Sequence, residues 1–129
     1  MTRVFLVEDH PLMRETIARL VTAQGDLEVI GTAGTATEAL RAVPEAAPDL
    51  VLVDLSLPDL SGNQLIEELV GTVDGLVALV VSGHDEALYA DAAIRAGARG
   101  FVMKDDPDEI IAAIRVVLSG ETYRSDRLV

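Results

Sequence analysis

The stretch Leu50–Gly62 reads LVLVDLSLPDLSG, and its first half indicates the fold class. The four residues Leu50–Val53 form a short apolar run, which is typical of a strand buried on both faces of a parallel sheet. Asp54 follows where this strand ends, and a loop containing Pro58 comes next. In an open α/β sheet, ligands bind outside the carboxyl ends of the strands. Asp54 is therefore the first candidate for a functional residue.

Polar residues also follow three other apolar runs of this kind. Val4–Val7 is followed by Glu8 and Asp9, Leu76–Val81 by Ser82, and Phe101–Met103 by Lys104. Because parallel strands end at the same edge of a sheet, we expect these side chains to converge there with Asp54. Carboxylates beside an ammonium group suit a divalent cation and a phosphoryl group.

Strand and helix signals alternate five times along the chain. Strands are expected at Arg3–Glu8, Leu27–Ala33, Leu50–Val53, Leu76–Val81 and Arg99–Met103. The first, third and fourth are the most apolar and belong in the middle of the sheet, whereas the second and fifth carry glycine or charge and belong at its edges. The chain is therefore predicted to be an α/β protein. Its doubly wound, five-stranded parallel sheet has the flavodoxin-like order 2-1-3-4-5, with helices on both faces.

Helices between these strands begin at recognisable residues. The start signals are Pro11, the capping boxes Thr35/Glu38 and Ser61/Gln64, Asp85 as a cap of the fourth helix, and Asp106 followed by Pro107. Residues 1–120 are expected to form one domain. Residues 121–129 show no periodic pattern and are expected to be a tail or the start of a linker.

The composition limits the classes of function. Half of the 129 residues are hydrophobic, which is enough for a core, and the net charge is −12, so we do not expect direct binding to nucleic acid. The absence of cysteine excludes thiol catalysis and cysteine-bound zinc. Since no signal-peptide pattern precedes the first strand and no apolar run is long enough to span a membrane, the expected location is the cytoplasm, with no membrane partner.

The convergent side chains favour one kind of chemistry. Asp9 and Asp54, with Glu8, supply oxygen ligands of the kind that Mg²⁺ binds. The Asp54 carboxylate is also able to act as a nucleophile and form an aspartyl phosphate. Lys104 and Ser82 would then contact phosphoryl oxygens.

Each of these residues, taken singly, also has an ordinary structural interpretation. An acid at a strand end can cap a helix, a serine can belong to a turn, and a lysine can simply be solvated. Their common position after four strands favours a shared site instead. The two histidines, His10 and His84, lack a zinc-like spacing and are not expected to be metal ligands.

Four segments match a known family in their order and spacing. They are Val7–His10 (VEDH), Val53–Gly62 (VDLSLPDLSG), Val81–His84 (VSGH) and Ala96–Lys104 (AGARGFVMK). With these segments the chain resembles the receiver domain of two-component response regulators over Arg3–Gly120, which is nearly its whole length.

The resemblance implies roles for individual residues. Asp54 would be the phosphoacceptor. Glu8 and Asp9 would be the acid pair that holds Mg²⁺, together with Asp54 and the backbone carbonyl of Ser56. Lys104 would contact the phosphoryl group.

The resemblance also implies a conformational switch. Ser82 would move toward the phosphoryl group, and the ring of Phe101 would turn inward as it does so. Ser56 and His84 flank the site at positions where family members tune the lifetime of the phosphoryl group. The implied partners are a sensor histidine kinase or a phosphotransfer protein, and a second copy of the chain in a homodimer formed on activation.

One position departs from the family pattern. Many receivers carry proline directly after the lysine, in a cis peptide, whereas Asp105 follows Lys104 here. Ala96–Lys104 and Ser119–Leu128 are most similar to the NarL/LuxR-type subfamily, in which a linker leads to a helix-turn-helix domain. DNA contact is expected only through such a domain, outside these 129 residues. We therefore expect the regulatory part of a DNA-binding transcriptional regulator; the alternative is a stand-alone relay or interaction adaptor.

Two other functions are compatible with this fold. A Mg²⁺-dependent phosphohydrolase would use the same aspartate, but such enzymes commonly carry a second acid where Ser56 stands, and a cap insertion for which the connections are too short. An interaction module that is never phosphorylated would not need all five polar residues. We expect a phosphoacceptor that takes part in its own phosphoryl transfer and autodephosphorylation, not a turnover enzyme.

Overall fold

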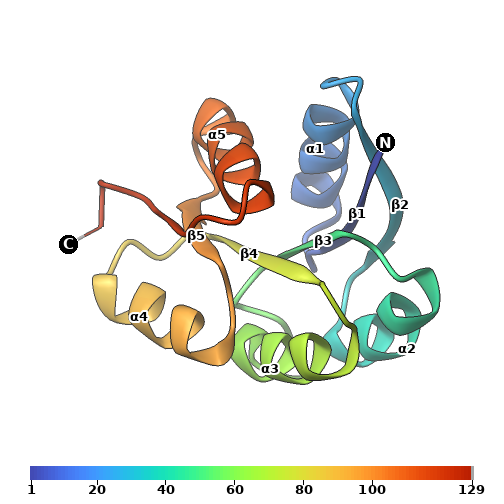
Figure 1. Ribbon diagram of the computed structural model, residues 1–129. Helices are drawn as coiled ribbons and strands as arrows, with labels where there is room; N and C mark the ends of the chain where they lie inside the picture. Colours follow the sequence, from blue (N-terminus) through green and yellow to red (C-terminus); the bar gives the residue numbers. More distant parts are fainter. Residues whose placement is uncertain (129) are drawn as a thin grey trace.

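A parallel β-sheet lies between two layers of helices in the computed structural model, which describes residues 1–128 (Figure 1). The strands are β1 (Thr2–Val7), β2 (Leu27–Ala33), β3 (Leu50–Val53), β4 (Val77–Ser82), β5 (Gly100–Met103) and β6 (Tyr123–Arg124). The helices are α1 (Pro11–Thr22), α2 (Ala36–Ala46), α3 (Gly62–Thr72), α4 (Ala87–Ala96) and α5 (Pro107–Leu118). Within residues 1–128, no helix combines the length and the apolar character that crossing a membrane requires.

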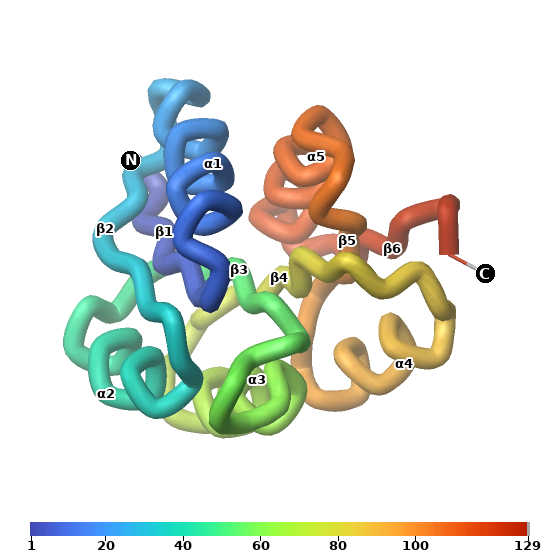
Figure 2. The backbone as a smooth tube through the Cα atoms, turned by 180° about the vertical axis from the view of Figure 1, so that it is seen from behind, coloured from blue at the N-terminus to red at the C-terminus, as the bar shows by residue number. Residues whose placement is uncertain are grey.

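The strand order is β2-β1-β3-β4-β5-β6, and every pair of neighbours is parallel. The predicted order 2-1-3-4-5 is confirmed, but the fifth strand does not lie at the edge. β6, which lies in the segment expected to be a tail or linker, pairs with it through Tyr123 opposite Gly100 (Figure 2). A two-residue strand is too short to produce an alternating pattern, which is why the sequence did not indicate it. A Cβ on Gly100 would lie 3.0 Å from the carbonyl oxygen of Tyr123, so the bare glycine admits this close neighbour.

The two faces of the sheet are covered unequally. α1 and α5 lie on one face and α2, α3 and α4 on the other (Figures 1 and 2). Successive residues of β1 alternate between the two cores: Val4 and Leu6 pack toward α1 and α5, whereas Phe5 and Val7 pack toward the other three helices. β3 is buried along its whole length, as expected for a strand covered on both faces.

Most of the expected helix starts are present. The side chains of Thr35, Ser61 and Asp106 each accept the backbone N–H three residues later, at 3.1, 3.2 and 3.1 Å. The expected cap by Asp85 was wrong. α4 begins one residue later than predicted, so Glu86 takes the cap position, and no side-chain hydrogen bond is formed there by the residues described.

A second cap of α2 comes from a distant part of the chain. Asp59, in the loop between β3 and α3, accepts the backbone N–H groups of Ala36 and Thr37 at 2.9 and 2.8 Å. These groups belong to the first turn of α2, where backbone donors have no partner inside the helix. Hydrogen bonds from Thr37 and from the two backbone N–H groups lower the pKa of Asp59 to about 2. The loop that follows Asp54 is thereby tied to α2.

Replacing Asp59 with alanine is expected to lower the urea midpoint of unfolding at pH 7. Two backbone N–H groups lose their acceptor, and the N-terminus of α2 loses a favourable negative charge. The stabilisation is fully present above the ordinary pKa of 3.8 and is lost as the pH falls toward about 2, since the folded-state pKa is the lower one. Urea titrations of both proteins from pH 7 to pH 3 should therefore show the difference between them shrinking on the acid side. Asp74→Ala, at an exposed position between α3 and β4, serves as the control. An equal loss at Asp74, or a pH-independent difference at Asp59, would contradict the prediction.

Candidate functional site

The carboxyl ends of four strands meet at one edge of the sheet, as predicted. Hydrogen bonds between backbone groups continue past the strand ends. The N–H of Asp54 donates to the carbonyl of Val7 at 3.0 Å, and the N–H of Lys104 donates to the carbonyl of Ser82 at 2.8 Å. The N–H of Glu8 similarly donates to Ala33 at 3.0 Å, on β2. The residues at the strand ends are thus held by the same ladder that forms the sheet.

Asp54 directly follows β3 and is buried at this edge. Its side chain is 3% exposed, and its Oδ1 accepts the backbone N–H of Ser56 at 3.2 Å. Gly62 lies directly beneath it, where a Cβ would lie 2.7 Å from the carbonyl oxygen of Asp54 and 2.8 Å from the Cα of Leu55. Any larger residue at position 62 would displace the loop that carries Asp54.

Lys104 connects the two most buried carboxylates. Its Nζ donates to Oε1 of Glu8 at 2.8 Å and lies 3.3 Å from Oδ2 of Asp54. The side chain of Glu8 is 2% exposed and that of Lys104 is 17% exposed, so this ion pair is shielded from water. One ammonium group therefore serves two carboxylates, and Glu8 holds the shorter contact.

The unequal contacts separate the two carboxylates electrostatically. Burial by itself would raise the pKa of Glu8, but the hydrogen bonds from Lys104 and from the backbone of His10 outweigh it and lower the pKa to about 2. Burial raises the pKa of Asp54, and the negative charge of Glu8 raises it further. The two carboxylates in turn keep the pKa of Lys104 above 10.5, even though its burial acts in the opposite direction. The charge of Asp54 is therefore less well compensated than that of Glu8.

The residues present fit a divalent cation. Oxygens of Glu8, Asp9 and Asp54 and a ring nitrogen of His10 lie within 4.8 Å of one another. Oδ1 of Asp9 and Oδ2 of Asp54 are buried and have no hydrogen-bond donor of good geometry among residues 1–128. Buried carboxylate oxygens are normally paired, so two such atoms without a donor leave coordination capacity for a cation.

The two residues assigned to the switch lie on the neighbouring strands β4 and β5. Ser82 is fully buried at the end of β4, and its Oγ accepts the backbone N–H of His84 at 3.0 Å. Phe101 is fully buried in the core beneath α2, α3 and α4. Nε2 of His84 lies 3.3 Å from Oγ of Ser56, and its ring stacks on Tyr89 of α4 with the centroids 4.5 Å apart. The peptide bond after Lys104 is trans.

Three residues at the site were not assigned a role from the sequence. His10 joins the carboxylates although it was not expected to be a ligand. Arg14, on α1, donates to the carbonyl of Glu8 at 2.8 Å and so holds the loop after β1. Gly62 provides the space for the Asp54 loop. His10 could have been found from the sequence, because it directly follows two acids. The contact of Arg14 could not, because it depends on how α1 packs.

Known proteins with similar sequences share this arrangement of strands and helices. The family model of the response regulator receiver domain matches residues 4–115. A LuxR-family two-component response regulator from Aurantimonas sp. SI85-9A1 is 34% identical with a TM-score of 0.93, over 98% of this chain and 91% of that one. The signal receiver domain of the response regulator NarL from Mycobacterium tuberculosis is 31% identical with a TM-score of 0.87, over 93% and 98%.

Curated relatives extend beyond the matched region. The transcriptional regulatory protein UhpA of Salmonella typhimurium is 37% identical over 124 residues, which are 95% of this chain and 62% of that protein. The DNA-binding transcriptional activator DevR/DosR of Mycobacterium tuberculosis is 37% identical over 130 residues, with coverages of 98% and 59%. The chain thus spans about three fifths of the length of these relatives.

Replacing Asp54 with asparagine is expected to raise the free energy of unfolding of the metal-free protein at pH 7 by about 0.5–2 kcal/mol, the range that is common for single stabilising substitutions. Asparagine retains an acceptor for the N–H of Ser56 and removes the charge that burial and Glu8 disfavour. Urea unfolding in the presence of EDTA measures the change. Asp9→Asn is the matched control, with a smaller expected effect because the side chain of Asp9 is 27% exposed. A less stable Asp54→Asn variant would contradict this reading of the site.

Proposed function

The chain belongs to the response regulator receiver domain family, and from this we propose that Asp54 accepts a phosphoryl group from a phosphohistidine of a sensor kinase or phosphotransfer protein. The observation that supports the proposal most directly is the pairing of a buried carboxylate with a buried ammonium group, Asp54 with Lys104, at the carboxyl edge of the sheet. Relatives of this family are response regulators and not turnover enzymes.

The transfer requires one bond to form and one to break. An oxygen of the Asp54 carboxylate forms a bond to phosphorus as the phosphorus–nitrogen bond of the donor breaks, and the electron pair of that bond stays with the donor imidazole. Oδ1 of Asp54 accepts the N–H of Ser56, and Oδ2 is the oxygen that lies near Lys104. The ammonium group of Lys104, within 3.3 Å of Oδ2, is placed to neutralise a phosphoryl oxygen.

A divalent cation fits the remaining side of the site. Glu8, Asp9, Asp54 and the backbone carbonyl of Ser56 are the proposed ligands of Mg²⁺, which when bound would neutralise charge on the phosphoryl group. Without a cation, the extra negative charge of a phosphoryl group, about 1.5–2 units, would meet three carboxylates. The chain's own contribution is to hold these acids close together, with two of their oxygens lacking a hydrogen-bond donor of good geometry among residues 1–128.

The proposed output is a shift between two conformations of the α4–β5–α5 side. New hydrogen bonds from Ser82 to the phosphoryl group would require its Oγ to leave the N–H of His84, and Phe101 would repack. Inverting a 1:99 equilibrium needs about 5.5 kcal/mol of preference for the active state. Two or three charge-assisted hydrogen bonds, at about 1.5–3 kcal/mol each, are of this size.

We also propose that this domain regulates a DNA-binding protein. Its relatives include a DNA-binding transcriptional activator, and the matched region is three fifths of their length. The switch would then alter self-association or contact with a DNA-binding domain outside this chain. The proposed location is the cytoplasm, where bacterial DNA lies. A stand-alone relay or adaptor is the alternative, and the presence or absence of a coding region for such a domain in the gene distinguishes them.

Exposure to acetyl phosphate and Mg²⁺ is expected to add the mass of one phosphoryl group to the protein, because Asp54 is the only site assigned as acceptor. Intact-mass spectrometry measures the adduct. Asp54→Asn should remove it, and Asp74→Asn should leave it unchanged. An undiminished adduct in Asp54→Asn would refute the assignment. Steady release of phosphate over many turnovers from a small phosphate ester would instead favour a phosphohydrolase, and the absence of any adduct in the wild type would favour an unphosphorylated interaction module.

Replacing Ser82 with alanine is expected to uncouple the adduct from the switch. Beryllofluoride with Mg²⁺ should still bind at Asp54, but the shift of the Phe101 ring signals in the NMR spectrum should fall to a small fraction of that of the wild type, because the hydroxyl that follows the phosphoryl group is missing. Ser125→Ala, at the other buried serine outside the site, is the control. The same Phe101 response in Ser82→Ala and in the wild type would show that Ser82 does not transmit the change.

A further inference from the structure

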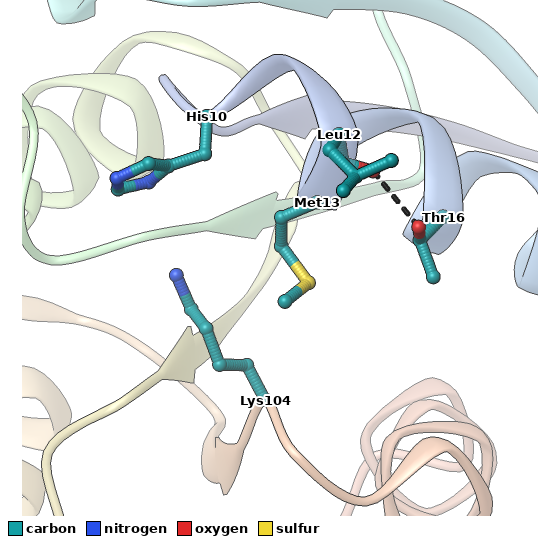
Figure 3. A pocket seen from close by; sticks show the side chains of 5 residues that line it. All are labelled: His10, Leu12, Met13, Thr16 and Lys104. Atoms are coloured by element: carbon teal, nitrogen blue, oxygen red, sulfur yellow. Dashed lines mark hydrogen bonds between the residues drawn. The ribbon is translucent and has the colours of Figure 1, made fainter.

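His10 lies inside the acidic cluster, although it follows the acid pair in the sequence and is exposed to solvent. Its Nδ1 is 3.2 Å from Oε2 of Glu8 and 3.2 Å from Oδ1 of Asp9. His10 and Lys104 line one pocket together with Leu12, Met13 and Thr16 of α1. The ring of His10 and the ammonium group of Lys104 lie at the same end of this pocket (Figure 3). The Nδ1 atom of the imidazole therefore lies against the acid pair.

The spacing of these atoms suits a shared metal ion. Ligand atoms at adjacent corners of an octahedron lie about 3 Å apart when the bonds to the ion are about 2.1 Å long. The two distances from Nδ1 are close to this value, and the ligand atoms of His10, Glu8, Asp9 and Asp54 all lie within 4.8 Å of one another. The tautomer that carries its proton on Nε2 presents the lone pair of Nδ1 to this point.

A second observation identifies the cluster as a place for a cation. Oδ2 of Asp54 is buried, belongs to a side chain that is 3% exposed, and has no hydrogen-bond donor of good geometry within the described part of the chain. Lys104 gives its hydrogen bond to Oε1 of Glu8, which leaves Oε2 of Glu8 on the side of His10. Lys104 thus contacts one oxygen of Glu8, and His10 contacts the other.

We propose that His10 is a metal ligand through Nδ1. The site would then bind a first-row transition ion of the Co²⁺, Ni²⁺ or Zn²⁺ class, and the affinity for that ion would depend on the imidazole. The inference rests on the metal site of the proposed function and adds one ligand to it. An all-oxygen site suits Mg²⁺, whereas an imidazole nitrogen among carboxylates favours the transition ions. The imidazole therefore adds affinity for transition ions, while the oxygen ligands still suit Mg²⁺.

A purely structural role for His10 makes a different prediction. If the ring only donates a hydrogen bond to Glu8, removing it changes the charge of the site and alters the affinities for Mg²⁺ and Ni²⁺ in the same proportion. If Nδ1 binds the ion, the affinity for Ni²⁺ falls and that for Mg²⁺ changes little. The ratio of the two dissociation constants separates the roles.

Calorimetric titration of the untagged chain with Ni²⁺ and, separately, with Mg²⁺ tests the proposal in the wild type, His10→Ala and His10→Gln. Both variants are expected to weaken Ni²⁺ binding at least about tenfold, while Mg²⁺ binding stays within about twofold. Glutamine keeps an N–H donor for Glu8, so a loss shared by both variants reports the missing ligand and not a missing hydrogen bond. Asp74→Ala, at an exposed position between α3 and β4, should leave the ratio unchanged. Contact-shifted imidazole ring proton signals in the Ni²⁺-loaded wild type, absent in His10→Gln, are the expected spectroscopic result.

The outcomes separate this inference from the function on which it rests. An unchanged ratio in both His10 variants, together with Mg²⁺ binding and an Asp54 adduct, overturns the inference alone. Restoration of Ni²⁺ affinity by glutamine overturns it as well, because a hydrogen bond would then be sufficient. Binding of neither ion by the wild type overturns both the inference and the proposed metal site.

Discussion

The site depends on one ammonium group shared unequally by two buried carboxylates. Lys104 gives its hydrogen bond to Glu8 and only a longer contact to Asp54. Burial makes this inequality matter, because neither carboxylate has much water to compensate for a missing partner. Glu8 is therefore an ordinary ion-paired acid, whereas Asp54 keeps a buried oxygen that has no hydrogen bond among residues 1–128. The proposed cation or phosphoryl group would therefore meet a carboxylate whose hydrogen bonding is incomplete within residues 1–128.

The sheet supplies the precision that this arrangement needs. Val7, Ser82 and Ala33 are strand residues, and their carbonyls accept N–H groups of residues at the strand ends. The backbone of the site consequently extends the hydrogen bonding of the sheet, whose strands pack side chains into a core on each face. Asp59 adds a tie from the loop after Asp54 to the first turn of α2. Side chains placed in this way need little rearrangement to act together.

The sequence predicted those features that arise from local patterns. Runs such as Leu50–Val53 indicate strands buried on both faces, and parallel strands end at the same edge, so the sequence alone predicts Asp54 and Lys104 at one edge. Features that depend on packing between distant segments were not accessible: Asp59 caps a helix that starts 23 positions earlier in the chain. β6 has only two residues, too few for a pattern. His10 was discounted on spacing to other histidines, although its neighbours in the site are carboxylates contributed by two loops.

The two-residue strand β6 bears on how this molecule behaves at high concentration. An open sheet ends in unpaired N–H and C=O groups, which are able to recruit a strand from another molecule. β6 covers the outer edge of β5 but is itself too short to offer a long template, and Arg124 is joined to Asp91 of α4 at 2.6 Å. At the opposite edge, β2 carries the exposed Glu28 and an irregular register beside it. Both borders of the sheet are thus poor templates for edge-to-edge aggregation.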